Sequence, residues 1–242
     1  MHKPLGVIFD LGGTILQSVS TDWTAGTQRL LDLAEDGHGY TAASLEPISS
    51  ELVRELFAFR EKSEIELRYE DYVKVLCETR HISLRVSYPD VVREMWNAAL
   101  RFEPTEGVRE VLIGLESRGI RMGVLSNSSF SGPLLKEELE KHDLARFFTF
   151  VISSADYGLR KPNGRLTAVA LSKLGLTAAD VWFVGDLVEI DVAAAMKAGL
   201  CAVWYNPKGE RLPESFSCME VGHWREFAAR VDWFYGEGDE AT

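Results

Sequence analysis

Residues 5–14 read LGVIFDLGGT, an apolar run that ends in Asp10 and continues into two glycines. A run of this length without an internal polar residue is typical of a strand buried on both faces of a parallel sheet. Parallel strands need crossover connections, and helices in those connections cover both faces of the sheet. The stretch therefore predicts an α/β fold with Asp10 at the carboxyl end of its first strand.

The chain repeats this pattern after residue 103. Four further apolar runs each lead into polar or glycine-bearing residues; they cover residues 121–125, 148–152, 181–184 and 200–205. Between them, apolar residues recur every three or four positions, which is typical of helices with one buried face. Strands that alternate with helices predict a Rossmann-like parallel sheet core with helices on both faces.

The segment from Gln17 to Phe102 breaks the alternation. It carries four stretches of helical pattern and no strong strand pattern, and Pro104 and Gly107 mark the return to the core. We therefore predict a helical domain of four helices at residues 17–102, inserted after the first strand. Residues 1–16 and 103–242 are predicted to form the α/β core domain.

Composition narrows the class of protein and of partner. The formal net charge is −11, which disfavours nucleic acid as a partner because both surfaces repel each other. The chain has no apolar run of the roughly 18 residues that a membrane helix needs. Its three cysteines are widely spaced and form no CxxC pair, which favours a reducing compartment. We expect a cytoplasmic protein, either monomeric or homodimeric.

Polar residues that follow the predicted strands mark the candidate site, because ligands of open α/β sheets bind at the carboxyl ends of the strands. These residues are Asp10, Ser126, Asn127 and Asp186. Lys161 is predicted to open a helix, with Pro162 in its first turn. Together they offer a carboxylate, a hydroxyl, a cation and a metal ligand, which is the chemistry that phosphoryl transfer uses.

Four short motifs in this order resemble those of the haloacid dehalogenase-like hydrolases. They are DLGGT at 10–14, VLSNS with Ser126, RKP with Lys161, and VGDLVEIDVAAAMKAG with Asp186 and Asp191. The resemblance covers the chain from Val7 to about Asn206, and the helical insert is similar to the cap of the subfamily that places it directly after the first motif. It implies a hydrolase that acts on a small phosphorylated substrate.

The resemblance also implies roles for single residues. Asp10 is the expected nucleophile, which forms an aspartyl-phosphate. Asp10, Asp186 and the backbone carbonyl of Gly12 are the expected ligands of Mg²⁺, which prefers oxygen ligands. Asp191 is expected to hold a water on the metal or to orient Lys161.

The remaining predicted residues bind the phosphate group. Ser126 and the N–H of Asn127 are expected to donate hydrogen bonds to phosphate oxygens, as are the N–H groups of Leu11 and Gly12. Lys161 is expected to neutralise the phosphate and to restrain Asp10.

Gly12 departs from the family pattern, because typical phosphatases of this family carry there a second Asp, which protonates the leaving alcohol and then activates water. Three interpretations follow: a phosphatase that does without this acid, a phosphate-binding protein with little turnover, or a hydrolase of carbon–phosphorus or carbon–halogen bonds. Asp186 and Asp191 weigh against dehalogenation, which needs no Mg²⁺. We favour the phosphatase.

Phosphonate hydrolysis would need a cap lysine that forms a Schiff base, and the insert offers Lys62 and Lys74. Both lie in highly charged stretches, where a solvated lysine is expected. Arg60, Glu61 and Lys62 are possible contacts of the substrate, without a signal that ranks them.

Overall fold

The computed structural model describes residues 2–61 and 63–236. Within these ranges, six parallel strands form one sheet in the order β10–β9–β8–β1–β6–β7. The strands are β1 (Gly6–Phe9), β6 (Arg121–Ser126), β7 (Val151–Ser153), β8 (Val181–Gly185), β9 (Cys201–Tyr205) and β10 (Met219–Val221). The predicted α/β class is confirmed. The strand expected at 148–152 begins later, at Val151, and β10 was not predicted.

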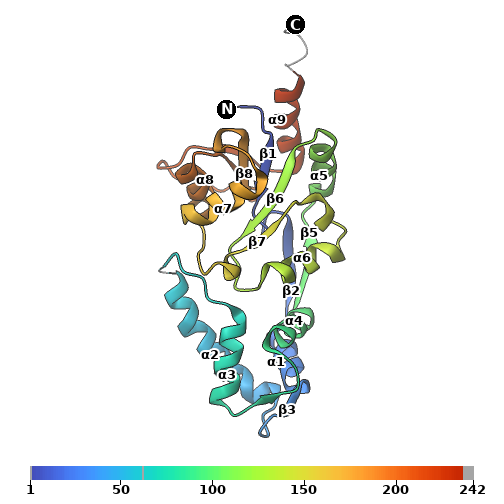
Figure 1. Cartoon of the computed structure of the whole chain (residues 1–242), viewed down its shortest axis with the longest axis vertical. Helices are drawn as coiled ribbons and strands as arrows, with labels where there is room; N and C mark the ends of the chain where they lie inside the picture. The colour runs from blue at the N-terminus through green and yellow to red at the C-terminus, as the bar shows by residue number, and fades with distance from the viewer. Residues whose placement is uncertain (1, 62, 237–242) are drawn as a thin grey trace.

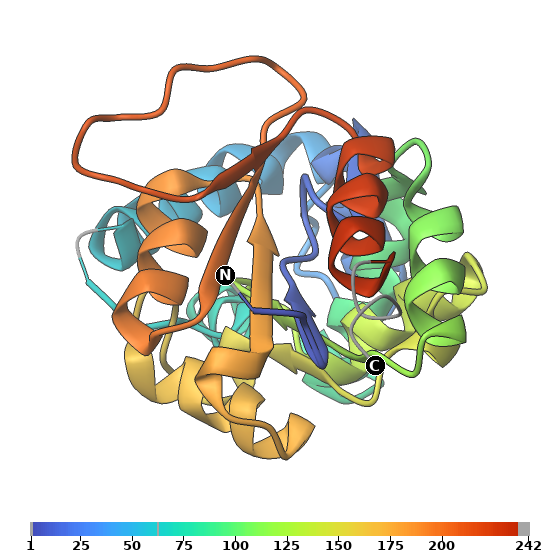
Figure 2. The ribbon, with the colours of Figure 1, turned by 90° about the horizontal axis from the view of Figure 1, so that it is seen from above.

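Helices cover both faces of this sheet because successive residues of β1 point to opposite sides. Val7 and Phe9 pack in one apolar cluster, and Ile8 packs in another. The first cluster includes residues of α5 (Val108–Ser117), α6 (Gly132–Lys141) and α9 (Trp224–Gly236), and the second includes residues of α7 (Gly164–Leu174) and α8 (Ala193–Ala198). Figure 2 shows α5 and α9 on one side of the sheet, with α7 and α8 on the other.

A group of helices lies below the sheet in Figure 1. It contains α1 (Trp23–Asp32), α2 (Ala42–Glu61), α3 (Tyr69–Thr79) and α4 (Tyr88–Ala99). All of them fall inside the segment predicted to be a helical cap. The domain boundaries at residues 16 and 103 stay a prediction.

Two pairs of short antiparallel strands in the same segment were not predicted. The strands β2 (Leu16–Thr21) and β5 (Leu100–Pro104) pair where the chain leaves and re-enters the sheet, and β3 (Ala34–Asp36) pairs with β4 (Ser83–Leu84). Five of the six residues of β2 are exposed. A strand with so little buried surface carries none of the apolar alternation by which strands are recognised in a sequence.

The described helices lack the features of a membrane span. None of them combines the length and the apolar content that crossing a bilayer requires.

Candidate active site

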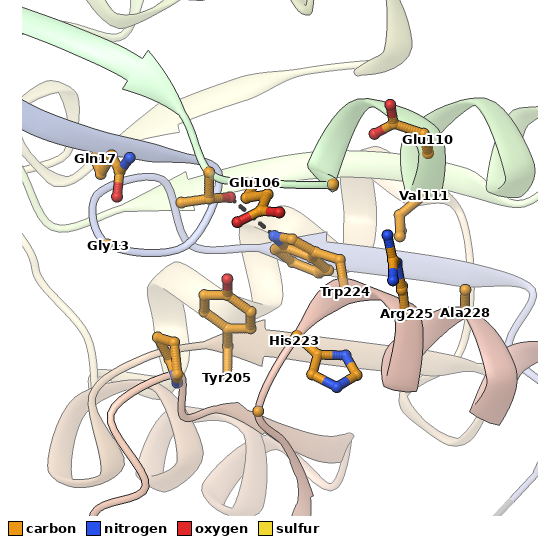
Figure 3. A pocket seen from close by; sticks show the side chains of 14 residues that line it. Gly13, Gln17, Glu106, Glu110, Val111, Tyr205, His223, Trp224, Arg225 and Ala228 are labelled. Carbon is orange, nitrogen blue, oxygen red and sulfur yellow. Dashed lines mark hydrogen bonds between the residues drawn. The ribbon is translucent and has the colours of Figure 1, made fainter.

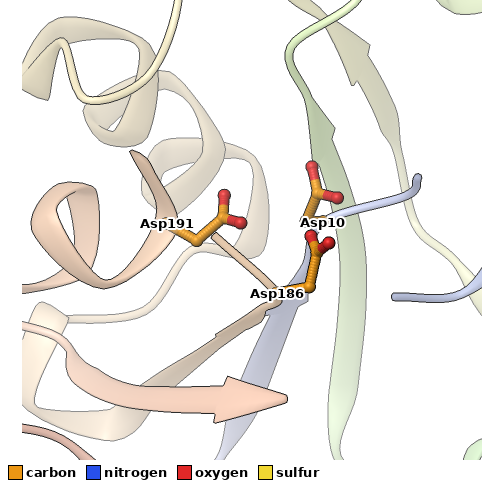
Figure 4. Close-up of side chains that lie close together, drawn as sticks. All are labelled: Asp10, Asp186 and Asp191. Atoms are coloured by element: carbon orange, nitrogen blue, oxygen red, sulfur yellow. The ribbon is translucent and has the colours of Figure 1, made fainter. Parts of the chain in front are cut away.

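Three carboxylates meet at the carboxyl ends of neighbouring strands. Asp10 follows β1, Asp186 follows β8, and Asp191 lies in the helical turn Val188–Val192. The Asp10 N–H donates to the Val184 carbonyl at 2.8 Å, which continues the pairing of the two strands. An oxygen of each carboxylate lies within 4.8 Å of the others (Figure 4). Asp10 precedes Asp186 by 176 positions and Asp191 by 181 positions in the sequence. The fold brings these three side chains together.

Lys161 is the cation of this cluster. Its Nζ lies 2.5 Å from Oδ1 of Asp10 and 2.7 Å from Oδ1 of Asp191. The side chain is buried, and this burial lowers the pKa of Lys161, but the two carboxylates outweigh it, so the pKa is raised overall. Asp191 also accepts the N–H of Leu187 at 3.1 Å, which fixes its carboxylate toward the lysine.

The secondary structure at Lys161 differs from the prediction. It does not open a helix: α7 begins at Gly164 with Asn163 as its N-cap, and Lys161 lies in the preceding loop. The physical reason is Pro162, because a residue before proline is disfavoured in helical conformation.

Asn127 holds that loop in place. Its Nδ2 donates to the Lys161 carbonyl at 3.0 Å, and the Lys161 N–H donates to its Oδ1 at 2.7 Å. Two hydrogen bonds from one amide fix the backbone of Lys161 at this point. The sequence had suggested only a backbone role for Asn127 toward phosphate, so this positioning role of its side chain was missed.

The charges in the cluster do not balance. Burial, assisted by the charge of Asp191, raises the pKa of Asp10 to about 7 against the lowering effect of Lys161. Burial and Asp191 also raise the pKa of Asp186 to about 6. Oδ1 of Asp186 is buried and has no hydrogen-bond partner among the described residues. An unpaired carboxylate oxygen beside two further carboxylates fits a site for a hard divalent cation such as Mg²⁺.

Two glycines leave room for these carboxylates. A Cβ on Gly13 would lie 2.3 Å from Oδ2 of Asp186, and the φ of Gly13 is +79°, which disfavours other residues. A Cβ on Gly185 would lie 2.4 Å from the Asp191 side chain. A side chain at Gly185 would therefore displace Asp191, and one at Gly13 would both displace Asp186 and strain the backbone.

The loop after Asp10 is a closed turn. The Gly13 N–H donates to the Leu16 carbonyl at 2.8 Å, and the Ile15 and Leu16 N–H groups donate to the Leu11 carbonyl at 2.9 Å. The N–H groups of Leu11 and Gly12 take no part in these bonds. Since Phe9 pairs with Val124, Ser126 at the end of β6 lies beside this turn. The predicted phosphate-binding groups thus lie along one edge of the sheet.

Two cavities adjoin the site, and they differ in which groups they reach. The larger, of about 850 Å³, lies between α5, α9 and the end of β9, and the predicted site residues do not line it (Figure 3). It reaches the cluster only through Gly13. The smaller, of about 250 Å³, is lined by Leu11, Gly12, Ser126 and Asn127. The smaller cavity therefore faces the predicted phosphate-binding groups.

The cap supplies the other side of the smaller cavity. Arg60, Trp96, Leu100 and Phe102 line it, together with Phe130 from the core. Of these, the sequence singled out only Arg60 as a possible contact. Apolar residues in helical spacing indicate burial and do not reveal which of them face a cavity between two parts of a fold.

Glu66 links this wall to the core. Nε of Arg60 lies 2.6 Å from Oε1 of Glu66, and Ser154 Oγ donates to Oε2 of Glu66 at 2.7 Å. The Glu66 N–H donates to the Gly158 carbonyl at 3.1 Å. Glu66 is buried and was not anticipated from the sequence, because its core partners Ser154 and Gly158 lie 88 and 92 positions away from it.

Of the two lysines that could form a Schiff base, the structure describes Lys74. Lys74 is exposed on α3, with Nζ 3.9 Å from Oε1 of Glu78, and lines neither cavity. Lys62 lies outside the described residues.

The chain is similar to several known proteins. A family described as haloacid dehalogenase-like hydrolase matches residues 7–205. A phosphoserine phosphatase of Thermus thermophilus is 35% identical over 111 residues, which are 45% of this chain and 43% of that protein. A phosphoglycolate phosphatase of Aliivibrio fischeri is 28% identical over 195 residues, which are 80% of each chain.

The fold has solved counterparts as well. A 2-haloacid dehalogenase of Pseudomonas syringae superposes with a TM-score of 0.67 and 21% identity, covering 97% of this chain and all of the other. The chain covers less than half of the length of several curated relatives, including the Thermus protein.

Proposed function

Because this chain belongs to the haloacid dehalogenase-like hydrolase family, we propose that it is a Mg²⁺-dependent phosphatase of a small phosphorylated metabolite. The observation that carries the proposal is the buried Asp10, bonded to Lys161 and beside Asp186 with its unpaired oxygen. The phosphatases among the relatives support the reaction class. A small phosphorylated compound is the proposed partner.

The proposed metal ligands are Asp10, Asp186 and the backbone carbonyl of Gly12. When bound, Mg²⁺ supplies positive charge that offsets the carboxylates and polarises a phosphoryl oxygen. Asp191 is assigned to Lys161 and not to the metal, because Nζ of Lys161 lies 2.7 Å from its Oδ1.

The reaction proceeds in two displacements at phosphorus. A carboxylate oxygen of Asp10 attacks the phosphorus, the bond to the leaving oxygen breaks, and an aspartyl-phosphate forms. Lys161, the Ser126 hydroxyl and the N–H groups of Leu11, Gly12 and Asn127 hold the phosphoryl oxygens, whose charge they stabilise. Water then attacks the phosphorus, which releases phosphate and restores the Asp10 carboxylate.

Gly12 limits the leaving groups that this chain can use. Among the described residues that line the smaller cavity, Glu138 carries the carboxylate that could replace the missing acid. Its Oε2 accepts hydrogen bonds from Trp96 Nε1 at 2.8 Å and from Lys141 Nζ at 2.6 Å. A carboxylate engaged as an acceptor in this way is a poor proton donor. We infer that the preferred leaving group departs as a weak base.

Gly12 also favours a second candidate, a phosphate-binding protein with little turnover. Hydrolysis of carbon–halogen bonds has less support, since the unpaired oxygen of Asp186 indicates a metal. Hydrolysis of carbon–phosphorus bonds has less support among the described residues, since Lys74 is exposed and lines neither cavity.

A panel of phosphate monoesters tests the proposal. We expect release of phosphate with Mg²⁺, none with a chelator, and none from Asp10→Asn with Mg²⁺. Full activity in a chelator would exclude the metal-dependent mechanism. Tight binding of inorganic phosphate without hydrolysis of any ester would support the second candidate instead.

A further inference from the structure

The smaller cavity has a wall of three aromatic side chains, Trp96, Phe102 and Phe130, here called the aromatic wall. The rings of Trp96 and Phe102 are stacked, with centroids 5.1 Å apart and planes at 18°. The rings of Trp96 and Phe130 meet edge to face at 4.6 Å and 71°. Leu16 and Leu100 extend this apolar surface.

Hydrogen bonds and stacking fix the aromatic wall before any ligand binds. Trp96 Nε1 donates to Glu138 at 2.8 Å, which joins α4 of the cap to α6 of the core. Phe130 stacks on Tyr69 with centroids 4.6 Å apart. A wall held in this way costs little ordering entropy when a ligand packs against it.

The charged groups of the cavity are already engaged. Both Nε and Nη2 of Arg60 contact the carboxylate of Glu66, and Glu138 is bonded to Trp96 and Lys141. Among the described lining residues, these are the charged ones. A leaving group with its own carboxylate or second phosphate would therefore find hydroxyl and amide groups but no unengaged cation among these lining residues, which leaves its charge without a counter-ion.

Size narrows the ligand further. A cavity of roughly 150 Å³ with an apolar lining holds a benzene molecule, and pockets for drug-sized ligands begin near roughly 300 Å³. The cavity of about 250 Å³ lies between these sizes. It admits one ring with its linking atoms and is small for a nucleoside.

We propose, on the basis of the phosphatase function above, that the substrate is a monophosphate ester whose leaving group carries a single aromatic ring. The phosphate lies at Asp10, and the ring packs on the aromatic wall. Gly12 has open space where a Cβ would lie, with no heavy atom within 4 Å, so the linking atoms pass over it. This substrate class differs from the phosphoserine and phosphoglycolate named for two of the relatives.

Binding of two phosphonates tests the ring separately from the chemistry. Benzylphosphonate and ethylphosphonate share the phosphonate and its methylene group and differ in a ring against a methyl. With Mg²⁺ present, calorimetry should show benzylphosphonate binding roughly 10- to 100-fold more tightly, as expected for burying a phenyl group. Phe102→Ala should remove most of this preference, and Phe102→Leu part of it. Trp233→Ala removes an exposed aromatic residue of α9 and should leave the preference unchanged.

The outcomes separate the inference from the phosphatase proposal. Equal affinities, or no binding of either compound, would overturn the ring inference even if the protein hydrolyses other esters. Ring-dependent binding without hydrolysis of benzyl or phenyl phosphate would support the ring site and overturn the phosphatase proposal. A preference that survives both Phe102 variants would show that the ring binds elsewhere, and the inference would fail.

Discussion

Replacing Gly12 by aspartate tests the proposed mechanism where the chain departs from the phosphatase pattern. Gly12→Asp would place a carboxyl group beside the leaving oxygen, able to protonate it and then to activate water. The structure tolerates the change: a Cβ at this position meets no heavy atom within 4 Å, and Gly12 is not among the glycines with positive φ. The substitution therefore changes the chemistry without requiring the loop to move.

The expected gain follows from the role of a positioned acid and base, which contributes about 10²- to 10⁴-fold to the rate. Ethyl phosphate leaves as a strongly basic alkoxide and should gain most of this factor. Phenyl phosphate leaves as a weaker base and should gain less. The metal-free protein should lose stability, because a fourth carboxylate would join Asp10, Asp186 and Asp191 in a region of low dielectric.

The assay is kcat/KM for both esters with saturating Mg²⁺. Gly12→Asn is the matched control, since it adds nearly the same volume but its amide N–H protons are too weakly acidic to be transferred to the leaving oxygen. The aryl-to-alkyl rate ratio should fall by about tenfold or more in Gly12→Asp and stay unchanged in Gly12→Asn.

Two results would refute this reasoning. If the unmodified protein hydrolyses ethyl phosphate as fast as phenyl phosphate, another group already acts as the acid. If Gly12→Asn raises the alkyl rate as much as Gly12→Asp, the gain comes from the shape of the loop and not from proton transfer.

Three further outcomes are expected. Asp186→Asn should weaken Mg²⁺ binding measured by calorimetry and abolish ester hydrolysis, and undiminished affinity would remove Asp186 from the ligand set. Lys161→Met should cost about 3–5 kcal/mol in the free energy of unfolding at pH 8 without Mg²⁺, because it leaves the carboxylates of Asp10 and Asp191 buried without their cation; a denaturant curve that matches the unmodified protein would contradict this. The rise in Tm on adding Mg²⁺ should grow between pH 5 and pH 8. The pKa of Asp10 is raised to about 7 and that of Asp186 to about 6, so ionisation of these groups destabilises the metal-free fold as the pH rises. The metal binds the ionised carboxylates, so its stabilising effect should increase over the same pH range. A larger rise in Tm at pH 5 than at pH 8 would refute the assignment of Asp10 and Asp186 as metal ligands.

The sequence predicts the sheet and the strand-end residues well because a single geometric rule connects them. Parallel strands end at one edge, so polar residues directly after apolar runs must lie near one another. Asp10 and Asp186 follow this rule. The prediction that Lys161 opens a helix was wrong, and the sequence contains the signal against it: Pro162 directly follows Lys161 and disfavours a helical conformation there.

The aromatic wall and the contacts of Glu66 could not be predicted in the same way. Trp96 and Phe130 lie 34 positions apart, and their contact exists only after the cap docks on the core. Periodicity shows that each is apolar and buried, but it carries no information on which buried residues border a cavity. The core partners of Glu66, Ser154 and Gly158, are equally non-local.

The two ends of the inserted segment lie side by side because strands β2 and β5 pair with each other. Leu16 lies opposite Pro104, and the Asp22 N–H donates to the Ala99 carbonyl at 2.7 Å. Because the inserted segment begins and ends in the same pair of antiparallel strands, its length and composition can change while the six-stranded sheet keeps its register. A chimera that joins this sheet to another cap through the same pair of strands should therefore keep the carboxylate cluster and exchange the wall that faces the leaving group.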